Sequence, residues 1–450
     1  MSHAVFYSEA KITAAAGFGK VAHLPCIFDS RPGYHRDASR YLIDRGLGIW
    51  NPETRGRTLR ALPPTDQTIK NYAYWLVNFL DWAEVRGVEI RRCDYVNDVQ
   101  GRYQTEMLKG IWSRDKEGLS PTTVNLRVQQ ACDFLTWMSD KKLRDAFDVP
   151  TQLVRVTTRS ATSSIGHRSH EVAVRKGKVR LNKRRLRMPT DIQTSAWLGL
   201  VYEAQGNTLG LMCETVMLTA ARRAEISCWR VDTLPEAKAE WHISNPLMPA
   251  EQQRVLVTLK FGTKGPCFGY DHGDKVGPER SIWIPLSLAE RLHEYRHKLR
   301  NPALRQWVKS ATTAKEREDR RTDTVHLFLD EQTGERLTDK HLYNAWTSVE
   351  LPFKGWSPHL GRDWWACSVL WAEMQKHQHL LASGQDVAIA LLESTAISII
   401  RLQIRPQLGH ADDSTTMRYL QWVADMMGFA PTIKYESDHE AAVIESRGRT

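Results

Sequence analysis

Four short segments carry residues that could hold or attack a phosphate group, and the first contains Arg222 and Glu225. Residues three apart share one face of a helix, so the glutamate can hold the guanidinium ready for a bidentate contact with phosphate. The alternative is a surface ion pair that contributes little to stability. This segment alone is therefore a weak signal.

The second and third segments add a lysine and a histidine–arginine pair. Lys264 lies in a turn between two candidate strands, where a lysine can reach a DNA groove, although solvated turn lysines are commoner. Ser357 and Pro358 are typical of an N-cap and a first helical residue, which places His359 and Arg362 near a helix N-terminus. Free N–H groups at that end favour a phosphate; a chance capping motif is the alternative.

The fourth segment joins two predicted helices. Gly409 should end the first, and Asp413 or Ser414 should cap the second, so Tyr419 falls about one turn into it, with His410 between the two helices. By itself, a tyrosine in a helix is better interpreted as a core aromatic residue.

In chain order, the segments resemble the tyrosine recombinase, or phage integrase, family. Thr219–Glu225 stands in the place of its first arginine box, and His359 and Arg362 match its His-x-x-Arg box. The family's Leu-Gly-His motif, followed nine residues later by the nucleophile, matches Leu408–His410 and Tyr419.

The hairpin lysine of the family corresponds best to Lys264, with Lys260 as a second candidate, and the resemblance covers roughly residues 65–425. The sequence departs from the family at Asp363 and Trp364, where a histidine and a small hydroxyl residue are common. An insertion is expected around Gln375–Ala396.

The resemblance implies that the Tyr419 phenol attacks a DNA phosphodiester and leaves a 3′-phosphotyrosine, which a 5′ hydroxyl later reverses. Arg222 and Arg362 would clamp the two non-bridging oxygens, because their planar forks stay charged. Glu225 would orient Arg222. If Tyr419 is not the nucleophile, Tyr343 and Tyr435 are the alternatives.

Proton transfer falls to three other residues in the same resemblance. Lys264 would protonate the departing 5′ oxygen, while His359 and His410 would donate hydrogen bonds or help to move a proton. Bond energy stays in the phosphotyrosine, so neither a cofactor nor a divalent metal is expected.

Two helical domains should position these residues. Residues 61–150 have helical periodicity, with caps at Thr65 and Ser120, and Lys70 and Arg127 on the polar face are candidate DNA contacts. This part resembles the family's core-binding domain.

Residues 189–430 form the expected catalytic domain, with helical pattern through Trp197–Arg230. Strand-like alternation follows at Arg254–Lys260 and Ser281–Pro285, separated by a glycine-rich stretch.

Residues 151–188 are expected to be a flexible basic linker between the domains. Such a linker can follow a phosphate backbone and release counterions, although a merely solvated loop is the alternative. The candidate DNA contacts there are Arg175, Lys176, Lys178, Arg180, Lys183, Arg184 and Arg185.

Composition is compatible with this interpretation. The 450 residues include 62 Lys plus Arg against 52 Asp plus Glu, a formal net charge of +10 that favours a polyanionic partner. The seven cysteines are scattered without a CxxC pair, which suits a reducing compartment and indicates no zinc site. No secretory signal or membrane-spanning run is evident, so a cytoplasmic, nucleoid-associated protein is expected.

The predicted fold class is mainly α with a small antiparallel β-sheet, in which the two domains form a C-shaped clamp around the duplex. Residues 1–60 would be an irregular extension without an assigned role, and residues 431–450 a tail. The expected partners are double-stranded DNA, further copies in a homotetramer and possible accessory proteins. The expected role is in a mobile genetic element, without a choice between integration, excision and resolution. A monomeric type IB topoisomerase and a non-catalytic DNA-binding protein are the alternatives.

Overall fold

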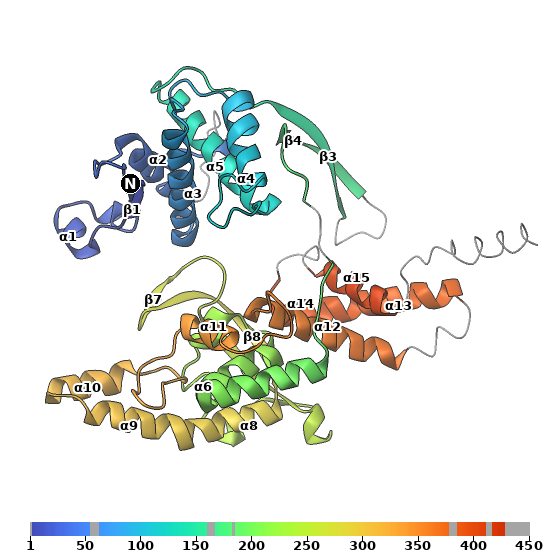
Figure 1. The fold of residues 1–450 in the computed structure, drawn as a ribbon. Coiled ribbons are helices and arrows are strands. Elements are labelled where there is room, and N and C mark those ends of the chain that lie inside the picture. Colours follow the sequence, from blue (N-terminus) through green and yellow to red (C-terminus); the bar gives the residue numbers. More distant parts are fainter. Residues whose placement is uncertain are drawn as a thin grey trace, which may run out of the picture. The chain divides into compact units, whose positions relative to one another are not determined.

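The computed structural model describes residues 2–54, 63–159, 167–181, 185–377, 385–410 and 416–427, in two compact units, Met1–Lys183 and Arg184–Thr450. The chain is mainly helical with small antiparallel sheets, which confirms the predicted fold class (Figure 1). Among the described residues, no helix has the length and apolar character needed to span a bilayer. The predicted clamp concerns how the units are placed and stays a prediction.

The first unit is built on two long helices, α3 (Asp66–Val85) and α5 (Pro121–Asp140), which pack against each other. Their predicted caps are confirmed, because the side chains of Thr65 and Ser120 accept hydrogen bonds from backbone N–H groups three residues further on. The unit's other helices and short strands are β1 (Ala4–Phe6), α1 (Ala10–Ala15), η1 (Gly19–Val21), β2 (Cys26–Phe28), α2 (Arg36–Gly46), η2 (Pro52–Thr54), η3 (Tyr95–Gln104) and α4 (Thr105–Leu108).

The expectation of an irregular extension over residues 1–60 is wrong for the described part. Strands β1 and β2 pair antiparallel, and α2 contributes Tyr41 and Leu42 to the same core as α3 and α5. Three-residue strands and an 11-residue helix contain too few repeats of apolar residues for a period to show in the sequence.

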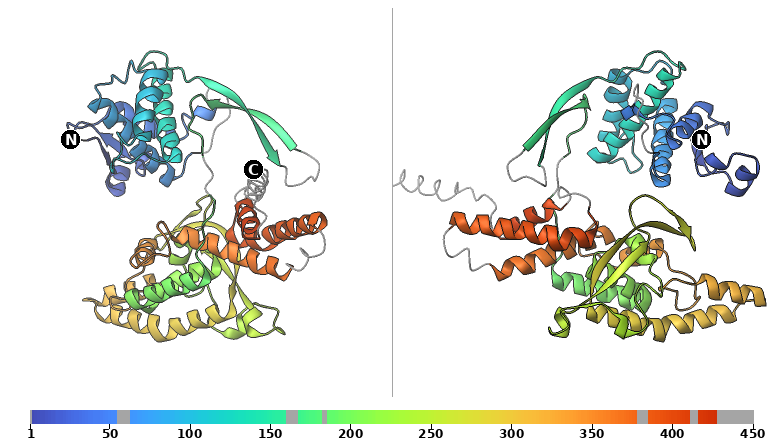
Figure 2. Two further views of the ribbon diagram at one scale, coloured as in Figure 1. Left: turned by 45° about the vertical axis from the view of Figure 1, so that its right-hand side comes forward. Right: turned by 180° about the vertical axis from the view of Figure 1, so that it is seen from behind.

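The expected flexible linker is also corrected, because much of residues 151–188 forms a β-hairpin. Strands β3 (Thr151–Arg159) and β4 (His167–Arg175) pair antiparallel as a long two-stranded ribbon (Figure 2). The run Val154–Thr158 is rich in β-branched residues, which favour strands.

The second unit packs its helices around a four-stranded antiparallel sheet of order β5-β6-β8-β7. The two predicted strands are confirmed as β6 (Arg254–Phe261) and β8 (Asp274–Pro285), with Arg254 opposite Pro285. Inward-facing residues of these strands form one core with α6 (Asp191–Thr219).

Four helices of the second unit carry residues of the candidate site. They are α7 (Arg223–Ser227), α12 (Pro358–Lys376), α14 (Arg405–Leu408) and α15 (Met417–Met426). The expected insertion contains α13 (Gln385–Ile399), which packs with α12 and α15 in a second apolar cluster. The remaining elements are η4 (Lys238–Glu240), β5 (Ile243–Ser244), η5 (Ala250–Gln252), β7 (Gly269–Asp271), α8 (Leu286–Tyr295), η6 (Arg296–Arg300), α9 (Asn301–Lys309), α10 (Ala314–Asp323), α11 (Asp339–Thr347) and η8 (Ile400–Ile404).

Candidate active site

Glu225 in α7 lies at the centre of the candidate site, with only 1% of its surface exposed. Its oxygens accept hydrogen bonds from the Arg222 backbone N–H at 2.7 Å and from Arg222 Nη1 at 2.8 Å. Arg280, from β8, donates to the same carboxylate through Nε at 3.0 Å and Nη2 at 2.6 Å. Arg362 Nη1, from α12, lies 3.9 Å from Glu225 Oε2. One buried carboxylate therefore gathers three arginines from distant parts of the chain.

The charges at this point do not cancel. Burial alone would raise the pKa of Glu225, but the hydrogen bond and charge of Arg280 and the charge of Arg222 outweigh burial and lower that pKa. Glu225 is therefore ionised, and three guanidinium groups surround a single negative charge. The excess of positive charge favours an anion such as phosphate.

A break in the helical chain explains how Arg222 reaches this place. The sequence predicted helical pattern through Trp197–Arg230, but α6 ends at Thr219 and Ala220 takes a left-handed conformation with φ 53°. Arg222 consequently precedes α7 in an extended conformation. Glu225, three residues later, can then accept from its N–H as in a capping box.

The C-terminal end of α14 holds the arginines from another side. Gly409 has a left-handed φ of 62° and ends the helix as predicted, which leaves the last carbonyl oxygens free to accept hydrogen bonds. Arg222 Nη2 donates to Leu408 O at 3.2 Å and Gly409 O at 3.1 Å, and Arg362 Nη2 donates to Leu408 O at 2.8 Å. The two guanidinium groups thus share a backbone acceptor.

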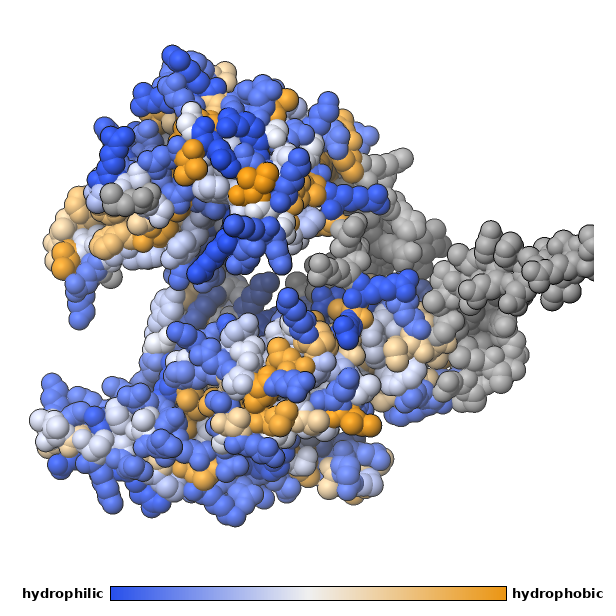
Figure 3. Space-filling view, viewed as in Figure 1, coloured by the Kyte–Doolittle hydropathy of each residue, from blue (hydrophilic) through white to orange (hydrophobic). Residues whose placement is uncertain are grey.

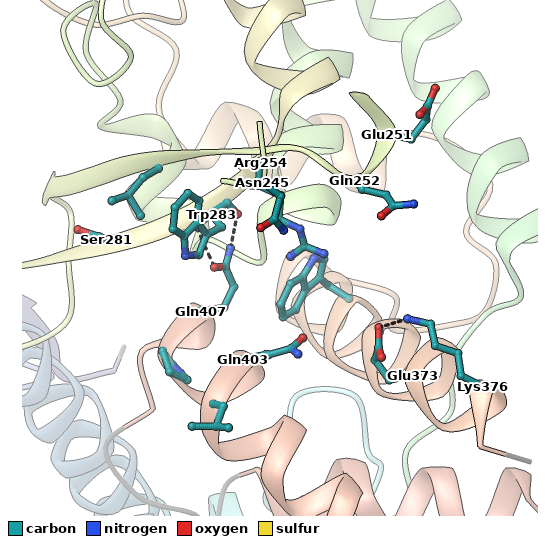
Figure 4. A pocket seen from close by; sticks show the side chains of 14 residues that line it. Asn245, Glu251, Gln252, Arg254, Ser281, Trp283, Glu373, Lys376, Gln403 and Gln407 are labelled. Atoms are coloured by element: carbon teal, nitrogen blue, oxygen red, sulfur yellow. Dashed lines mark hydrogen bonds and ion pairs between the residues drawn. The ribbon is translucent and has the colours of Figure 1, made fainter. Parts of the chain in front are cut away.

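Gln407 fastens this helix end to the sheet and to α6. Its Nε2 donates to Trp283 O at 2.8 Å, and its Oε1 accepts from the Trp283 N–H at 3.0 Å (Figure 4). Nε2 also donates to Thr219 O, at the end of α6, at 2.8 Å. Arg280 Nη1 donates to the Gln407 carbonyl at 2.6 Å. The backbone acceptors of the arginines are therefore held in fixed positions.

Two buried nitrogens at this site have no hydrogen-bond partner among the described residues, namely Arg362 Nη1 and His410 Nδ1. Burial, with repulsion from Arg222, lowers the pKa of Arg362 to about 10, so the side chain remains charged at neutral pH. Burial, with repulsion from Arg362 and Arg222, lowers the pKa of His410 to about 4. Buried polar groups are nearly always paired, so the unpaired nitrogens indicate a place for a ligand with acceptor oxygens.

His359 is the more exposed of the two candidate histidines and lies in the first turn of α12. Loss of hydration lowers its pKa, the charge of Asp363 opposes this effect, and the charge of Arg362 adds to it. His359 therefore lies in the same electrostatic field as His410 and Arg362.

Tyr419 lies beside the site, but its hydroxyl faces an acid. The side chain is only 1% exposed, and its hydroxyl donates to Asp363 Oδ1 at 2.7 Å, while Arg418 Nη2 binds Asp363 Oδ2. Burial raises the pKa of Tyr419 well above its usual value, and the charge of Asp363 raises it further. In this arrangement the phenol is a protonated, enclosed group rather than an exposed nucleophile.

Lys264 is exposed in the loop between β6 and β7, with no hydrogen bond or ion pair among the described residues. The loop starts against α7, because a Cβ added to Gly262 would lie 2.4 Å from the Ala224 carbonyl oxygen. The second candidate, Lys260, lies in β6 and forms an exposed ion pair with Glu279 at 3.9 Å. Lys264 is therefore the freer of the two lysines.

Arg175 is a correction among the predicted DNA contacts. It is 6% exposed, and its guanidinium donates to Tyr95 Oη at 2.6 Å, Gln104 Oε1 at 3.0 Å and Asn125 Oδ1 at 3.3 Å. Arg175 thus fastens the end of the hairpin to η3 and α5, and both of its terminal nitrogens have partners.

The other predicted contacts differ in how accessible they are. Arg127 is half-buried and donates to Asn78 Oδ1 at 3.1 Å, Arg185 pairs with Asp425 at 3.6 Å, and Lys183 and Arg184 lie outside the described residues. In the view of Figure 3, hydrophilic residues predominate over the described surface of both units. Five of the predicted DNA contacts are exposed to solvent, and their role stays a prediction: Lys70, Lys176, Lys178, Arg180 and Arg185.

Sequence reasoning missed Arg280, Gln407 and Arg418, and recorded Asp363 only as a departure from the family. One signal was present for Arg280: it shares a strand face with Ile282 and Ile284, which are buried. A charged residue on the buried face of a strand needs a partner, which here is Glu225. Gln407 and Arg418 had no comparable signal.

Comparisons with known proteins give similarity at the level of structure alone. No family model and no curated protein sequence matches the chain. The Tn1549 transposon integrase in complex with transposon right end DNA is 12% identical, with 91% of this chain and 99% of that chain covered and a TM-score of 0.44. The XerA recombinase is 12% identical, with 88% and 100% covered and a TM-score of 0.31. At such values the function has to be argued from the site itself.

A first expected result concerns His410. Its imidazole should titrate near pH 4 in the free protein, and inorganic phosphate should raise that midpoint, because a bound anion favours the charged ring. Histidine-selective NMR measures the midpoint, and His410→Asn identifies the signal. A midpoint near 6.5 without phosphate would contradict the buried, cationic environment described above.

Glu225→Gln should destabilise the second unit by about 3–5 kcal/mol, because it leaves buried arginines without their counter-charge. The urea midpoint of unfolding measures the change. Glu373→Gln, which removes the half-buried partner of the exposed Lys376, is the matched control and should change stability by less than about 1 kcal/mol. Equal effects of the two variants would show that Glu225 does not hold the arginines together.

Proposed function

We propose that this chain is a site-specific DNA recombinase, or integrase, that breaks and rejoins strands through a 3′-phosphotyrosyl intermediate for a mobile genetic element. The observation that carries the proposal is the convergence of Arg222, Arg362 and His410. The charges of the two arginines, with the unpaired nitrogens of Arg362 and His410, suit one phosphate. Tyr419 lies in α15, the helix that follows His410 in the chain. Its charge affects the pKa of Arg362, so the phenol lies close to the arginines.

The first task of such a site is to neutralise the scissile phosphate. Arg362 Nη2 already donates to the Leu408 carbonyl, whereas Nη1 has no hydrogen-bond partner among the described residues. Nη1 is therefore the donor available to a non-bridging oxygen. Arg222 and His410 would contact the other oxygen. Preorganised donors of this kind stabilise the extra charge of the pentacoordinate transition state.

The second task is proton transfer. The phenol oxygen of Tyr419 forms a bond to phosphorus and gives its proton to a neutral imidazole, that of His359 or His410, whose pKa values are both lowered. At the same time the bond to the 5′ oxygen breaks, and that oxygen takes a proton from the Lys264 ammonium. A DNA 5′ hydroxyl reverses both transfers and releases the tyrosine. All of these groups belong to the chain or the DNA, so no metal or cofactor enters the proposed step.

Tyr419 must change its surroundings before it can attack. Its hydroxyl is bound to Asp363, and the ring belongs to the apolar cluster that also contains residues of α12 and α13. We infer that α15 shifts when DNA binds, so that the hydroxyl exchanges Asp363 for the phosphate. Asp363 directly follows Arg362 in α12, and its charge acts on the pKa of His359. The Tyr419 hydroxyl would therefore pass polar groups as it moves from Asp363 to the phosphate.

Double-stranded DNA is the proposed partner, and four copies of the chain would assemble on it. The net charge of +10 and the exposed basic residues Lys176, Lys178 and Arg180 support binding to a polyanion. The Tn1549 integrase was itself solved with DNA.

One observation favours a second candidate function. A DNA-binding protein without catalysis would tolerate a Tyr419 that is buried and bonded to Asp363, as it is here. Such a protein would bind DNA and never become covalently attached to it. Covalent attachment therefore separates the two functions.

The test uses nicked duplexes tiled across the DNA that flanks the gene. Cleavage next to the nick releases a short fragment, so the protein stays trapped on the DNA and resists SDS. The proposal expects a trapped complex that forms equally well in EDTA. A complex that binds but is never trapped would support the second candidate, and cleavage that EDTA abolishes would indicate a metal-dependent nuclease.

A further inference from the structure

Asp274, the first residue of β8, lies in a buried ionic cluster outside the arginine site. It is 2% exposed, and its carboxylate is bonded to His326 Nε2 at 2.7 Å and to Arg336 Nη2. Cys228 Sγ donates to it at 3.3 Å, and Arg230 Nη2 lies 3.5 Å away. Four side chains therefore surround one buried carboxylate.

The cluster joins three separate segments of the second unit. Cys228 and Arg230 directly follow α7, while His326 and Arg336 come from the segment between α10 and α11. Arg230 Nη1 also donates to Asp271 Oδ2, in β7, at 2.7 Å. The cluster therefore ties both strands of the β7–β8 hairpin to the end of the helix that carries Glu225.

The loop that carries Lys264 is fastened to the beginning of β8. The Gly262 N–H donates to Lys275 O at 2.9 Å, Lys275 Nζ donates to Gly265 O at 2.8 Å, and the Phe268 N–H donates to Val276 O at 2.8 Å. These hydrogen bonds hold the loop on both sides of Lys264. The position of the loop consequently follows the position of residues 275–276, which Asp274 precedes.

The same loop also touches the cluster directly. A Cβ added to Gly262 would lie 3.0 Å from Cys228 Sγ and 2.4 Å from the Ala224 carbonyl oxygen, so the backbone approaches α7 closely. Gly277 is similarly close, because its added Cβ would lie 2.4 Å from Thr263 Oγ1. Lys264, by contrast, has no hydrogen bond or ion pair within the part of the chain that the structure describes.

We propose that Asp274 is a positioning residue that sets the place of Lys264 relative to the arginine site, so that the ammonium can reach the departing 5′ oxygen. This inference rests on the proposed function, because it gives Lys264 the role of the proton donor. Asp274 does not touch the DNA in this account. It acts through the hairpin, and its loss should impair one chemical step rather than the whole site.

A change in the leaving atom isolates that step. In a normal substrate the P–O bond breaks and the 5′ oxygen must be protonated as it leaves. In a duplex with a 5′-bridging sulfur, the P–S bond breaks and a thiolate leaves without a proton, because thiols are far more acidic than alcohols. A defect in the proton donor should therefore disappear with sulfur, whereas general damage to the site should not.

The experiment compares cleavage of the two duplexes by Asp274→Asn, Lys264→Ala and the wild-type chain. We expect Asp274→Asn to slow cleavage of the oxygen duplex about 10²-fold and to cleave the sulfur duplex within about 3-fold of the wild-type rate. Lys264→Ala should show the same selectivity, more strongly. Arg336→Gln, a milder change to the same cluster, should show it more weakly and guards against failure of Asp274→Asn to fold.

Glu214→Gln is the matched control, because it removes another largely buried carboxylate of this unit, which belongs to α6 and pairs with Arg291 of α8. Any slowing by this variant should be equal on both duplexes. The inference is overturned if Asp274→Asn slows both duplexes equally or neither, or if sulfur does not rescue Lys264→Ala. Absence of trapping by the wild-type chain would instead refute the proposed function itself.

Discussion

Tyr419→Phe is expected to bind DNA as tightly as the wild-type chain and to form no covalent complex with it. The change removes one hydroxyl, and with it the only atom of this side chain that can bond to phosphorus. The ring stays in place in the apolar cluster of α12, α13 and α15, so folding should be retained. Gel-shift binding and SDS-resistant trapping on the same nicked duplex measure the two properties separately.

Tyr343→Phe is the matched control for this prediction. Tyr343 lies on α11 and is 42% exposed, which makes it the accessible tyrosine of the two alternatives, while Tyr435 lies outside the described residues. The variant should still be trapped at the wild-type level. If trapping survived in Tyr419→Phe and disappeared in Tyr343→Phe, the nucleophile would be Tyr343 instead of Tyr419.

Arg362→Lys is expected to lower the rate of covalent trapping by about 10²–10³-fold, comparable to the loss of one preorganised donor at a transition state. The guanidinium uses one nitrogen for the Leu408 carbonyl and presents another, unpaired, to the site. A lysine has a single nitrogen and cannot span both positions with the same geometry. Single-turnover trapping at saturating protein measures the effect without a contribution from binding.

Arg296→Lys controls for the disturbance caused by changing any buried arginine. Arg296 is 5% exposed, donates through Nη2 to the Leu234 carbonyl, and also has an unpaired nitrogen, but it lies in η6, at the end of α8. Both variants should lose stability, and only Arg362→Lys should lose trapping per folded molecule. Equal losses of trapping would mean that Arg362 has a structural role alone.

Local sequence signals predicted the parts of the site that depend on neighbouring residues. Pro358 begins α12 as expected, with Ser357 at the N-cap position but without a capping hydrogen bond from its side chain. Gly409 ends α14 with the left-handed conformation that glycine favours. The strands that carry Arg254 and Ser281 are also where alternation predicted them. In each case the information lies within a few residues of the feature.

Contacts between distant segments could not be derived in this way. Arg280 meets Glu225 across 55 positions in the sequence, and Gln407 reaches Trp283 across 124. The early β-pair and α2 were missed because they are stabilised by burial against α3 and α5 rather than by their own periodicity. The charge of Arg175 alone predicts a DNA contact, because its three acceptors come from segments distant in the sequence.

Two different expectations from the sequence each describe part of what the structure shows for Tyr419. The motif around it predicted its place after His410, and the plain expectation for one tyrosine in a helix, a core aromatic, also describes its ring. The sequence contained Asp363 but gave no reason to pair it with Tyr419, since the two are 56 positions apart. The proposed chemistry therefore depends on a movement of α15 that releases the hydroxyl.

Identification of the residue that carries the DNA is the most direct test. Trypsin cuts after Arg418 and Lys434, so the peptide Tyr419–Lys434 contains Tyr419 and excludes both Tyr343 and Tyr435. Mass spectrometry of nuclease-trimmed covalent complex should find a nucleotide 3′-phosphate attached to Tyr419 in this peptide. A nucleotide on another residue, or DNA that is cut with no nucleotide left on the protein, would contradict the account.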